Sequence, residues 1–149
     1  MASRDIKDLT PRMQGKILNF EEGLMYAGLS HFKRCCTYRS QEEQNALWLR
    51  GRRPLSEVNA AFKSVGMAPI TEQQNKSKVT WRTISIHTSR EAVDYYIEID
   101  GKYCNDVKVD VDKDSIPDWK EFAEIAETCG LDSGYYWKKQ DVPHVQWRN

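Results

Sequence analysis

The sequence predicts an α+β domain in which helices pack against a small, mostly antiparallel sheet. Segments with helical and extended patterns follow one another in the order helix, strand, helix, strands, helix, strand, which favours this fold class. The chain has 149 residues, enough for one domain with a real core. Its composition, 40% hydrophobic and 30% charged, is typical of a globular protein. We therefore expect residues 1–149 to form a single domain.

The first helix is predicted within residues 9–29. Thr10 can cap its start, and proline at position 11 suits the first helical position because it has no amide hydrogen to leave unpaired. Four apolar residues then recur at helical spacing and form one stripe that we expect to lie in the core: Met13, Ile17, Phe20 and Leu24.

A short strand is expected at residues 35–40, followed directly by a second helix at residues 41–50. Ser40 and Glu43 have the spacing of a capping box at the start of this helix. Arg39 therefore falls at a strand end just before a helix begins, a kind of junction that often carries functional side chains.

The middle of the chain is expected to change from helical to extended structure. Residues 56–66 predict a short helix that ends at Gly66, and the polar residues 68–80 predict a loop. Residues 81–99 are rich in Ile, Val, Tyr and Thr and predict two strands. Valines alternate with charged residues in 102–112, which continues the strand pattern.

The last third of the chain predicts a third helix and a final strand. The helix lies within residues 115–130, with Pro117 near its start and Gly130 just past its end. Trp119, Phe122 and either Ile125 or Ala126 are expected to face inward. Residues 142–147 predict the last strand.

The charge balance and the absence of long apolar runs argue against two classes of protein, nucleic-acid-binding proteins and membrane-spanning proteins, although a local basic patch at Arg50, Arg52 and Arg53 leaves the first class open. Basic and acidic residues number 22 each, so no strongly basic face is expected and nucleic acid is not a predicted partner. The basic run at residues 50–53 is interpreted as a solvated loop. No apolar run approaches the roughly 20 residues of a membrane helix. Residues 1–14 contain no signal-peptide core, so we expect synthesis in the cytoplasm.

The four cysteines do not have the spacing of a zinc site. Cys35, Cys36, Cys104 and Cys129 include no Cys-x-x-Cys pair. We expect reduced and mostly buried thiols.

Two of the three histidines stand near carboxylates in segments that have a strand pattern. If a hairpin turned at residues 90–91, His87 and Asp94 would be cross-strand partners with Cβ atoms about 4.5–5.5 Å apart, close enough to bind one metal ion. His144 is the candidate third ligand, and three protein ligands leave one position for water. His31 has no carboxylate near it in the sequence and is interpreted as structural or exposed.

Asp141 is the candidate general base because it stands three residues before His144, and Pro143 between them bends the segment so that both can reach one cavity. A zinc-bound water has a pKa lowered towards about 7, and a nearby carboxylate can take its proton and pass it to a leaving amine. A cation opposite would stabilise the oxyanion. This set of groups is suited to amide hydrolysis.

The same residues follow the motif spacing of a known family. Its Ser-x-His-x6-Asp segment is matched by Ser85, His87 and Asp94, and its Pro-His pair by Pro143 and His144, with the acidic residue three positions before. Residues 37–52 ("TYRSQEEQNALWLRGR") and 117–131 ("PDWKEFAEIAETCGL") match further segments in the same order. Residues 10–147 thus resemble the zinc peptidases of the hedgehog and D-Ala-D-Ala peptidase type, which include D-alanyl-D-alanine carboxypeptidases and phage L-alanyl-D-glutamate endolysins.

The resemblance implies a zinc-dependent endolysin that cleaves the L-alanyl-D-glutamate bond of the peptidoglycan stem peptide. Zn²⁺ would be held by His87, Asp94 and His144, with Asp141 and Arg39 catalytic. The substrate-binding set predicted with them is Arg39, Gln44, Ser85, Tyr136 and Trp137. A monomeric catalytic domain without a wall-binding module is implied, released to the wall through a holin pore. The chain departs from the family pattern at Arg90, where glycine is usual, and in the stretch "LDSGYYWKKQ", residues 131–140.

Two other functions remain open. A D-alanyl-D-alanine carboxypeptidase would use the same chemistry at the end of the stem peptide. A non-catalytic module could keep the fold and bind the wall or a protein. Five aromatic residues could line a cleft, although packing in the core and at its rim is the favoured interpretation. They are Tyr95, Tyr96, Tyr135, Tyr136 and Trp137.

Overall fold

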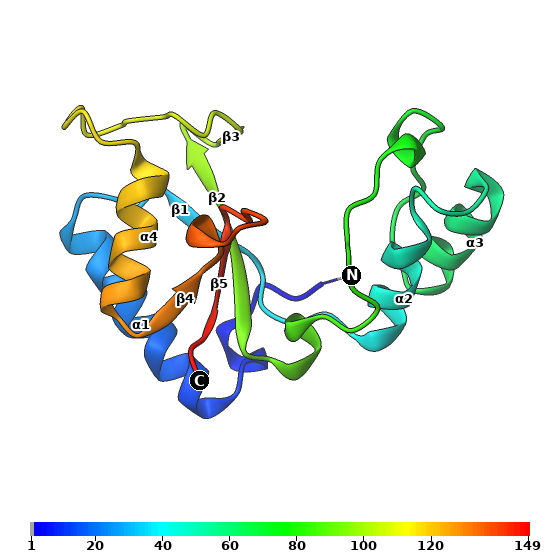
Figure 1. Ribbon diagram of the computed structural model, residues 1–149, viewed down its shortest axis with the longest axis horizontal. Coiled ribbons are helices and arrows are strands. Elements are labelled where there is room, and N and C mark those ends of the chain that lie inside the picture. The colour runs from blue at the N-terminus through cyan, green and yellow to red at the C-terminus, as the bar shows by residue number, and fades with distance from the viewer. Residues whose placement is uncertain (1) are drawn as a thin grey trace.

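The computed structural model describes residues 2–149 and contains a five-stranded sheet flanked by helices (Figure 1). The strands pair in the order β1-β2-β5-β4, β3 pairs with the end of β2, and every pair is antiparallel. The strands are Phe32–Cys36 (β1), Ala92–Ile99 (β2), Lys102–Cys104 (β3), Leu131–Ser133 (β4) and His144–Trp147 (β5). The α+β prediction with an antiparallel sheet is confirmed.

Four α-helices occur among the described residues: Pro11–Tyr26 (α1), Gln41–Leu49 (α2), Leu55–Ser64 (α3) and Asp118–Thr128 (α4). Short 3₁₀ turns are Ile6–Asp8 (η1), Gln74–Lys76 (η2), Ile86–Ser89 (η3) and Gly134–Tyr136 (η4). Three predicted helices and the short helix in the middle of the chain are therefore confirmed. No helix within residues 2–149 has the length and apolarity needed to cross a bilayer.

The main core forms where α1 and α4 pack on one face of the sheet. The Thr10 hydroxyl caps α1 by accepting a hydrogen bond from the Met13 amide, and all four residues of the predicted apolar stripe are buried. From α4, Trp119 and Phe122 meet Phe32 of β1 at ring-centroid distances of 4.8 and 4.7 Å. Side chains alternate across β2, so Val93 and Tyr95 join this core. Asp94, between them, faces the other side of the sheet.

A second, smaller hydrophobic cluster joins α2 to α3, which Figure 1 shows set apart from the sheet. Its buried members are Ala46, Val58 and Phe62. The predicted cap of α2 is present, because the Ser40 hydroxyl accepts a hydrogen bond from the Glu43 amide. The run Arg50–Arg53 forms the turn between the two helices.

The prediction of two strands across residues 81–99 is wrong in its first half. Only 92–99 forms a strand, and His87 lies in η3 rather than in a hairpin. The cause is local: the Ser85 hydroxyl accepts from the His87 amide, and the Thr88 hydroxyl donates to the Ser85 carbonyl. Such bonds offer the backbone an alternative to a strand ladder. Arg90 then takes a left-handed conformation with φ of 64°.

Two other strand boundaries also differ from the prediction. The first strand is 32–36 rather than 35–40, so Arg39 follows it by three residues. The strand expected over 102–112 ends at Cys104. Beyond it, aspartate side chains accept hydrogen bonds from nearby amides, as Asp106 does from Lys108 and Asp110 from Ser115. These side chains compete with a partner strand for the backbone donors.

The cysteines are free, as expected, but they are not mostly buried. Cys36 is buried, Cys104 and Cys129 are partly exposed, and Cys35 is exposed. The register between β1 and β2 shifts at this point: Cys36 pairs with Asp94, and Cys35 is the extra residue that has no partner on β2.

Candidate metal centre

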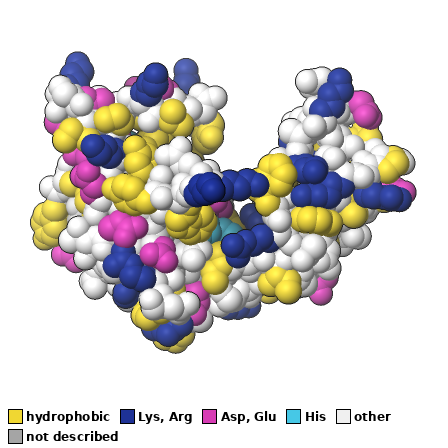
Figure 2. Space-filling view, in the orientation of Figure 1, with side chains coloured by type: hydrophobic (Ala, Val, Ile, Leu, Met, Phe, Trp, Pro, Cys, Tyr) yellow, Lys and Arg dark blue, Asp and Glu magenta, His cyan; other side chains and the backbone are white. Residues whose placement is uncertain are grey.

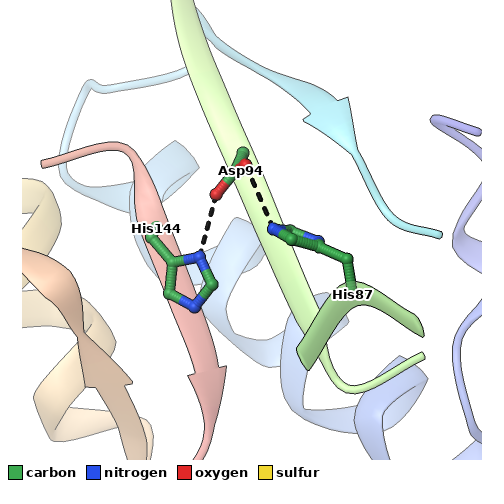
Figure 3. A group of neighbouring side chains, drawn as sticks. All are labelled: His87, Asp94 and His144. Atoms are coloured by element: carbon green, nitrogen blue, oxygen red, sulfur yellow. Dashed lines mark hydrogen bonds and ion pairs between the residues drawn. The ribbon is translucent and has the colours of Figure 1, made fainter. Parts of the chain in front are cut away.

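Three side chains from three different elements converge on the sheet face opposite the main core (Figure 3). His87 comes from η3, Asp94 from β2 and His144 from the start of β5. The Asp94 carboxylate lies between the two imidazoles, with Oδ2 3.1 Å from His87 Nε2 and Oδ1 3.0 Å from His144 Nδ1. One ligand atom from each residue lies within 4.8 Å of the other two.

Strand pairing and a tight turn produce this arrangement. Asp94 and His144 are register partners across the antiparallel β2–β5 pair. The left-handed Arg90 reverses the chain between η3 and β2, which brings His87 back over Asp94. The turn is anchored on the N-terminal segment, because the Thr10 amide donates to the Arg90 carbonyl at 3.0 Å. His87 and Asp94 therefore meet as expected, but through a 3₁₀ turn rather than across a hairpin.

The donor set fits a zinc ion. Two imidazole nitrogens and one carboxylate oxygen are common zinc ligands, and three protein ligands leave a position open in a tetrahedral site. On the far side of its ring, His144 Nε2 donates to Gln146 Oε1 at 2.9 Å. That bond fixes the proton on Nε2 and leaves Nδ1 directed at Asp94, which is how outer partners orient metal-binding histidines.

The electrostatics favour a cation between these groups. Burial would raise the pKa of Asp94, but hydrogen bonds from His144 and His87 outweigh it and hold the pKa well below its usual range. Burial lowers the pKa of His144, but Asp94 raises it by more, so the net shift is upward. In the absence of metal a protonated imidazole can therefore pair with Asp94, and a metal ion would replace that proton.

Asp141 lies at the edge of the three residues. Its Oδ2 is 3.9 Å from His144 Nδ1, and its side chain is half-exposed. Burial and the charge of Asp94 raise the pKa of Asp141, with His144 and His87 opposing. The chain is held close here, because the Asp141 amide donates to the Gly134 carbonyl at 2.8 Å.

Gly134 is a site residue that the sequence reasoning missed. A Cβ at this position would overlap the Asp141 carbonyl oxygen. The glycine therefore allows the close approach that positions Asp141. The only signal in the sequence is a glycine seven residues before the candidate base.

Arg39 is held beside the centre by a buried amide. Its Nη1 donates to Gln44 Oε1 at 3.0 Å, and its backbone amide donates to the His87 carbonyl at 3.4 Å. Gln44 is completely buried, and its Nε2 donates to Thr80 Oγ1 and the Arg82 carbonyl. Gln44 therefore holds Arg39 and the 80–82 segment in place, and it does not itself line the cavity.

A cavity of about 640 Å³ is lined by all three residues and lies between the 79–87 and 137–141 segments. Its walls carry both aromatic and basic side chains, which include Trp81, Trp137, Arg39, Arg82 and Lys139. Figure 2 shows basic side chains around this hollow, with histidine visible inside it. The two walls meet where Lys139 Nζ lies 3.4 Å from the centre of the Trp81 ring.

The remaining predicted substrate residues differ in position. Trp137 lines the cavity, with its ring 5.1 Å from that of His144. Ser85 also lines it, although its hydroxyl already caps η3. Tyr136 is half-exposed and is not among the lining residues. Tyr95 is buried in the core, in agreement with the packing interpretation.

A cysteine lies beside the candidate centre, and the third histidine lies elsewhere. Cys36 Sγ lies 3.7 Å from His87 Nδ1, and burial raises the pKa of this thiol to about 12. It therefore stays protonated, a poor form for binding metal. His31 is structural, as interpreted, and its Nε2 lies 2.8 Å from Oδ2 of Asp118, a carboxylate that is distant in the sequence. The fold brings that carboxylate from 87 residues further along the chain.

Comparison of the sequence with protein-family models and with curated proteins gives no match. Among solved structures, the chain is similar to the crystal structure of the Serratia marcescens L-Ala D-Glu endopeptidase ChiX. The superposition has a TM-score of 0.55 and 18% sequence identity, and it covers 99% of this chain and 89% of the other. At this identity the likeness concerns the fold.

Proposed function

We propose that this chain is a zinc-dependent peptidoglycan hydrolase that cleaves the stem peptide at the L-alanyl-D-glutamate bond. The observation that carries the proposal is the convergence of His87, Asp94 and His144 under a cavity, with Asp141 at its edge. The similarity in fold to an L-Ala D-Glu endopeptidase supports the choice of reaction and bond.

The metal would be held by His87 Nε2, the Asp94 carboxylate and His144 Nδ1. Bound zinc supplies a water of lowered pKa and a Lewis acid for the scissile carbonyl. Around it, Gln146 holds the ring of His144 in the required tautomer. Asp94 stays ionised because both histidines lower its pKa, and the ionised form is the one that binds a cation.

Asp141 would act as the proton carrier. It is close to the centre, and half of its side chain is open to the cavity. Its raised pKa suits a base that must take a proton from the attacking water and return it to the leaving amine. Because Gly134 fixes the backbone of Asp141, the carboxylate is positioned before substrate arrives.

The cavity walls fit an acidic peptide. Arg39, Arg82 and Lys139 line it, and they can pair with the carboxylates that a D-glutamate-containing stem peptide carries. Arg39, held by Gln44, is the cation best placed to bind substrate or stabilise the developing oxyanion. Trp81 and Trp137 provide flat apolar surfaces for the peptide backbone and alanine methyl group.

Digestion of purified peptidoglycan by the zinc-loaded chain tests the proposal. Mass spectrometry of the fragments should show new N-terminal D-glutamate. Asp141→Asn should lower turnover by about 100-fold or more while zinc content is unchanged. Release of free D-alanine instead would identify a carboxypeptidase. A wild type that binds zinc but releases no fragment from any peptidoglycan would overturn the hydrolase proposal in favour of a binding module.

An endolysin role is part of the same proposal. Co-expression with a holin in a bacterial host should cause lysis, and expression of the chain without the holin should not. The Asp141→Asn variant with the holin is the control, since it keeps the fold and lacks the chemistry. Lysis by this variant would show that wall cleavage by the chain is not the cause.

A further inference from the structure

A second group of carboxylates lies in the segment between β3 and α4 and in the first turn of α4, outside the candidate zinc site. This segment is yellow in Figure 1 and leads into the start of α4. The acidic residues of this group stand at positions 1, 3, 5, 9 and 12 of the twelve-residue stretch 110–121: Asp110, Asp112, Asp114, Asp118 and Glu121. That spacing is the one by which EF-hand loops supply calcium ligands.

The side chains are gathered in space as well as in sequence. Carboxylate oxygens of Asp110, Asp112 and Asp118 lie within 4.8 Å of one another. Oxygens of Asp112, Asp114 and Glu121 form a second such group. Asp112 belongs to both groups, so the five carboxylates surround one region.

The burial and the hydrogen bonds of the Asp118 carboxylate indicate a bound cation. It is completely buried, and its carboxylate is directed into the first group. Oδ2 accepts hydrogen bonds from His31 Nε2 at 2.8 Å and from the Val111 amide at 3.1 Å. Oδ1 is also buried and has no hydrogen-bond partner among residues 2–149. A buried carboxylate oxygen without a partner is costly, and a bound cation would satisfy it.

The negative charge of these five carboxylates also favours a bound cation. No lysine or arginine within residues 2–149 forms an ion pair with any of the five carboxylates. The pKa of Glu121 reflects this unbalanced charge. Burial and the neighbouring Asp114, Asp112 and Asp118 raise it to about 7. One of its oxygens, Oε2, is buried without a hydrogen-bond partner in the described chain.

The backbone of this stretch also has features of an EF-hand loop. The Asp110 carboxylate accepts from the amides of Asp114 and Ser115 at 3.3 and 2.9 Å, which closes the loop. Ser115 stands at position 6, where EF-hand loops have glycine for a sharp turn, and it takes the same left-handed region with φ of 72°. Serine there is strained, which is consistent with a conformation imposed by the carboxylates around it.

We propose that residues 110–121 bind one Ca²⁺ ion. The ligands are the five carboxylates and, at position 7, the carbonyl of Ile116. An all-oxygen set of this size suits calcium rather than zinc, and its irregular geometry suits calcium better than magnesium. The bound ion holds the start of α4, whose Trp119 and Phe122 belong to the core. The site is therefore a stabilising one, separate from the candidate zinc centre.

Thermal unfolding of the full chain tests this site. Metal-free protein should gain several degrees in Tm at about 5 mM CaCl₂, a concentration that saturates most extracellular calcium sites, and less at equal MgCl₂. Glu121→Gln should abolish the gain. Because this variant also removes like-charge repulsion, its metal-free Tm should equal or exceed that of the wild type, so a lost response cannot be ascribed to misfolding. Glu124→Gln, exposed on the same helix, should keep the full calcium response.

Terbium luminescence separates this site from the zinc centre. Trp119 adjoins Asp118 and should sensitise the luminescence of Tb³⁺ bound in the loop. Added Ca²⁺ should displace the Tb³⁺ and remove this emission. His144→Ala should keep the emission and Glu121→Gln should lose it. No calcium-dependent rise in Tm, an equal rise in Glu121→Gln, or emission that depends on His144 instead of Glu121 would each overturn the proposal.

Discussion

Asp94 is the side chain that links the two histidines of the candidate centre. It is the register partner of His144 on the neighbouring strand and reaches His87 on the turn before its own strand. Both imidazoles lower its pKa against the effect of burial. An ionised carboxylate between two ring nitrogens is a site for either protons or a metal, and zinc binding should release protons.

Asp94→Asn should therefore weaken zinc binding by at least about 100-fold, more than the loss of an outer partner such as Gln146. The amide is neutral and can direct an oxygen at only one imidazole. Zinc titration followed by calorimetry measures the change. Asp106→Asn, which alters an exposed aspartate outside both carboxylate groups, should leave zinc affinity unchanged. Equal zinc affinity in Asp94→Asn and wild type would remove Asp94 from the ligand set.

At the scale of elements, two short segments position the chemistry, and neither is a regular strand or helix. The turn after η3 brings His87 back to the sheet, and η4 holds Asp141 through Gly134. Each depends on one backbone feature: left-handed Arg90 in the first, and the missing Cβ of Gly134 in the second.

Gly134→Ala should displace Asp141 and lower kcat about 10-fold or more, because a small misplacement of a catalytic group is costly. Zinc content should change much less than kcat, because strand pairing still holds His144 in register with Asp94. Gly15→Ala is the matched control. A Cβ there meets no atom within 4 Å, and alanine should stabilise α1 by about 0.5–1 kcal/mol without affecting kcat. Unchanged kcat in Gly134→Ala would contradict the positioning role.

The turn between η3 and β2 should also show a pH dependence. A hydrogen bond from Arg12 lowers the pKa of Glu91, burial opposes this, and Thr10 adds to it. A lowered folded-state pKa means that the stabilisation is complete above the unfolded value of about 4.5 and is lost as pH falls through the folded value. Wild type should therefore lose stability below about pH 4.5 more steeply than Glu91→Gln in urea titrations. Parallel acid profiles for the two proteins would refute this contribution.

At the scale of the whole molecule, the cavity forms where two segments far apart in the chain face each other across the candidate centre. One wall comes from the 79–87 segment and the other from 137–141. Two contacts hold the walls: the Gln44 amide ties α2 to the 80–82 segment, and Lys139 stacks on Trp81. The width of the cavity therefore depends on residues that do not touch the three candidate ligands.

Trp81→Ala should raise KM several-fold with little change in Tm or zinc content, because the ring is exposed and its cation–π contact with Lys139 defines the cavity wall. Trp81→Phe should restore most of the affinity, since phenylalanine keeps an aromatic face. Steady-state kinetics on soluble muropeptides measures both. A KM unchanged in Trp81→Ala would show that substrate does not use this wall.

Local signals in the chain were sufficient for the helices and for the choice of candidate ligands. The caps at Thr10 and Ser40 and the apolar stripe of α1 act over a few residues, so their pattern carries the structure. The same holds for the helix that begins after Pro117. His87, Asp94 and His144 stood out because histidine is rare here and each neighbours a carboxylate or a strand pattern.

Long-range packing determined which of the candidate side chains meet in space, which the local patterns do not predict. Asp94 faces His144 only because β5 pairs with β2, and His31 meets Asp118 only because α4 packs beside β1. The strands expected at 81–89 and 105–112 gave way to turns, since hydroxyl and carboxylate side chains captured the backbone donors. Residue type and spacing thus determine which groups are available for chemistry. Their convergence depends on contacts between segments far apart in the chain, whose free energy no local pattern contains.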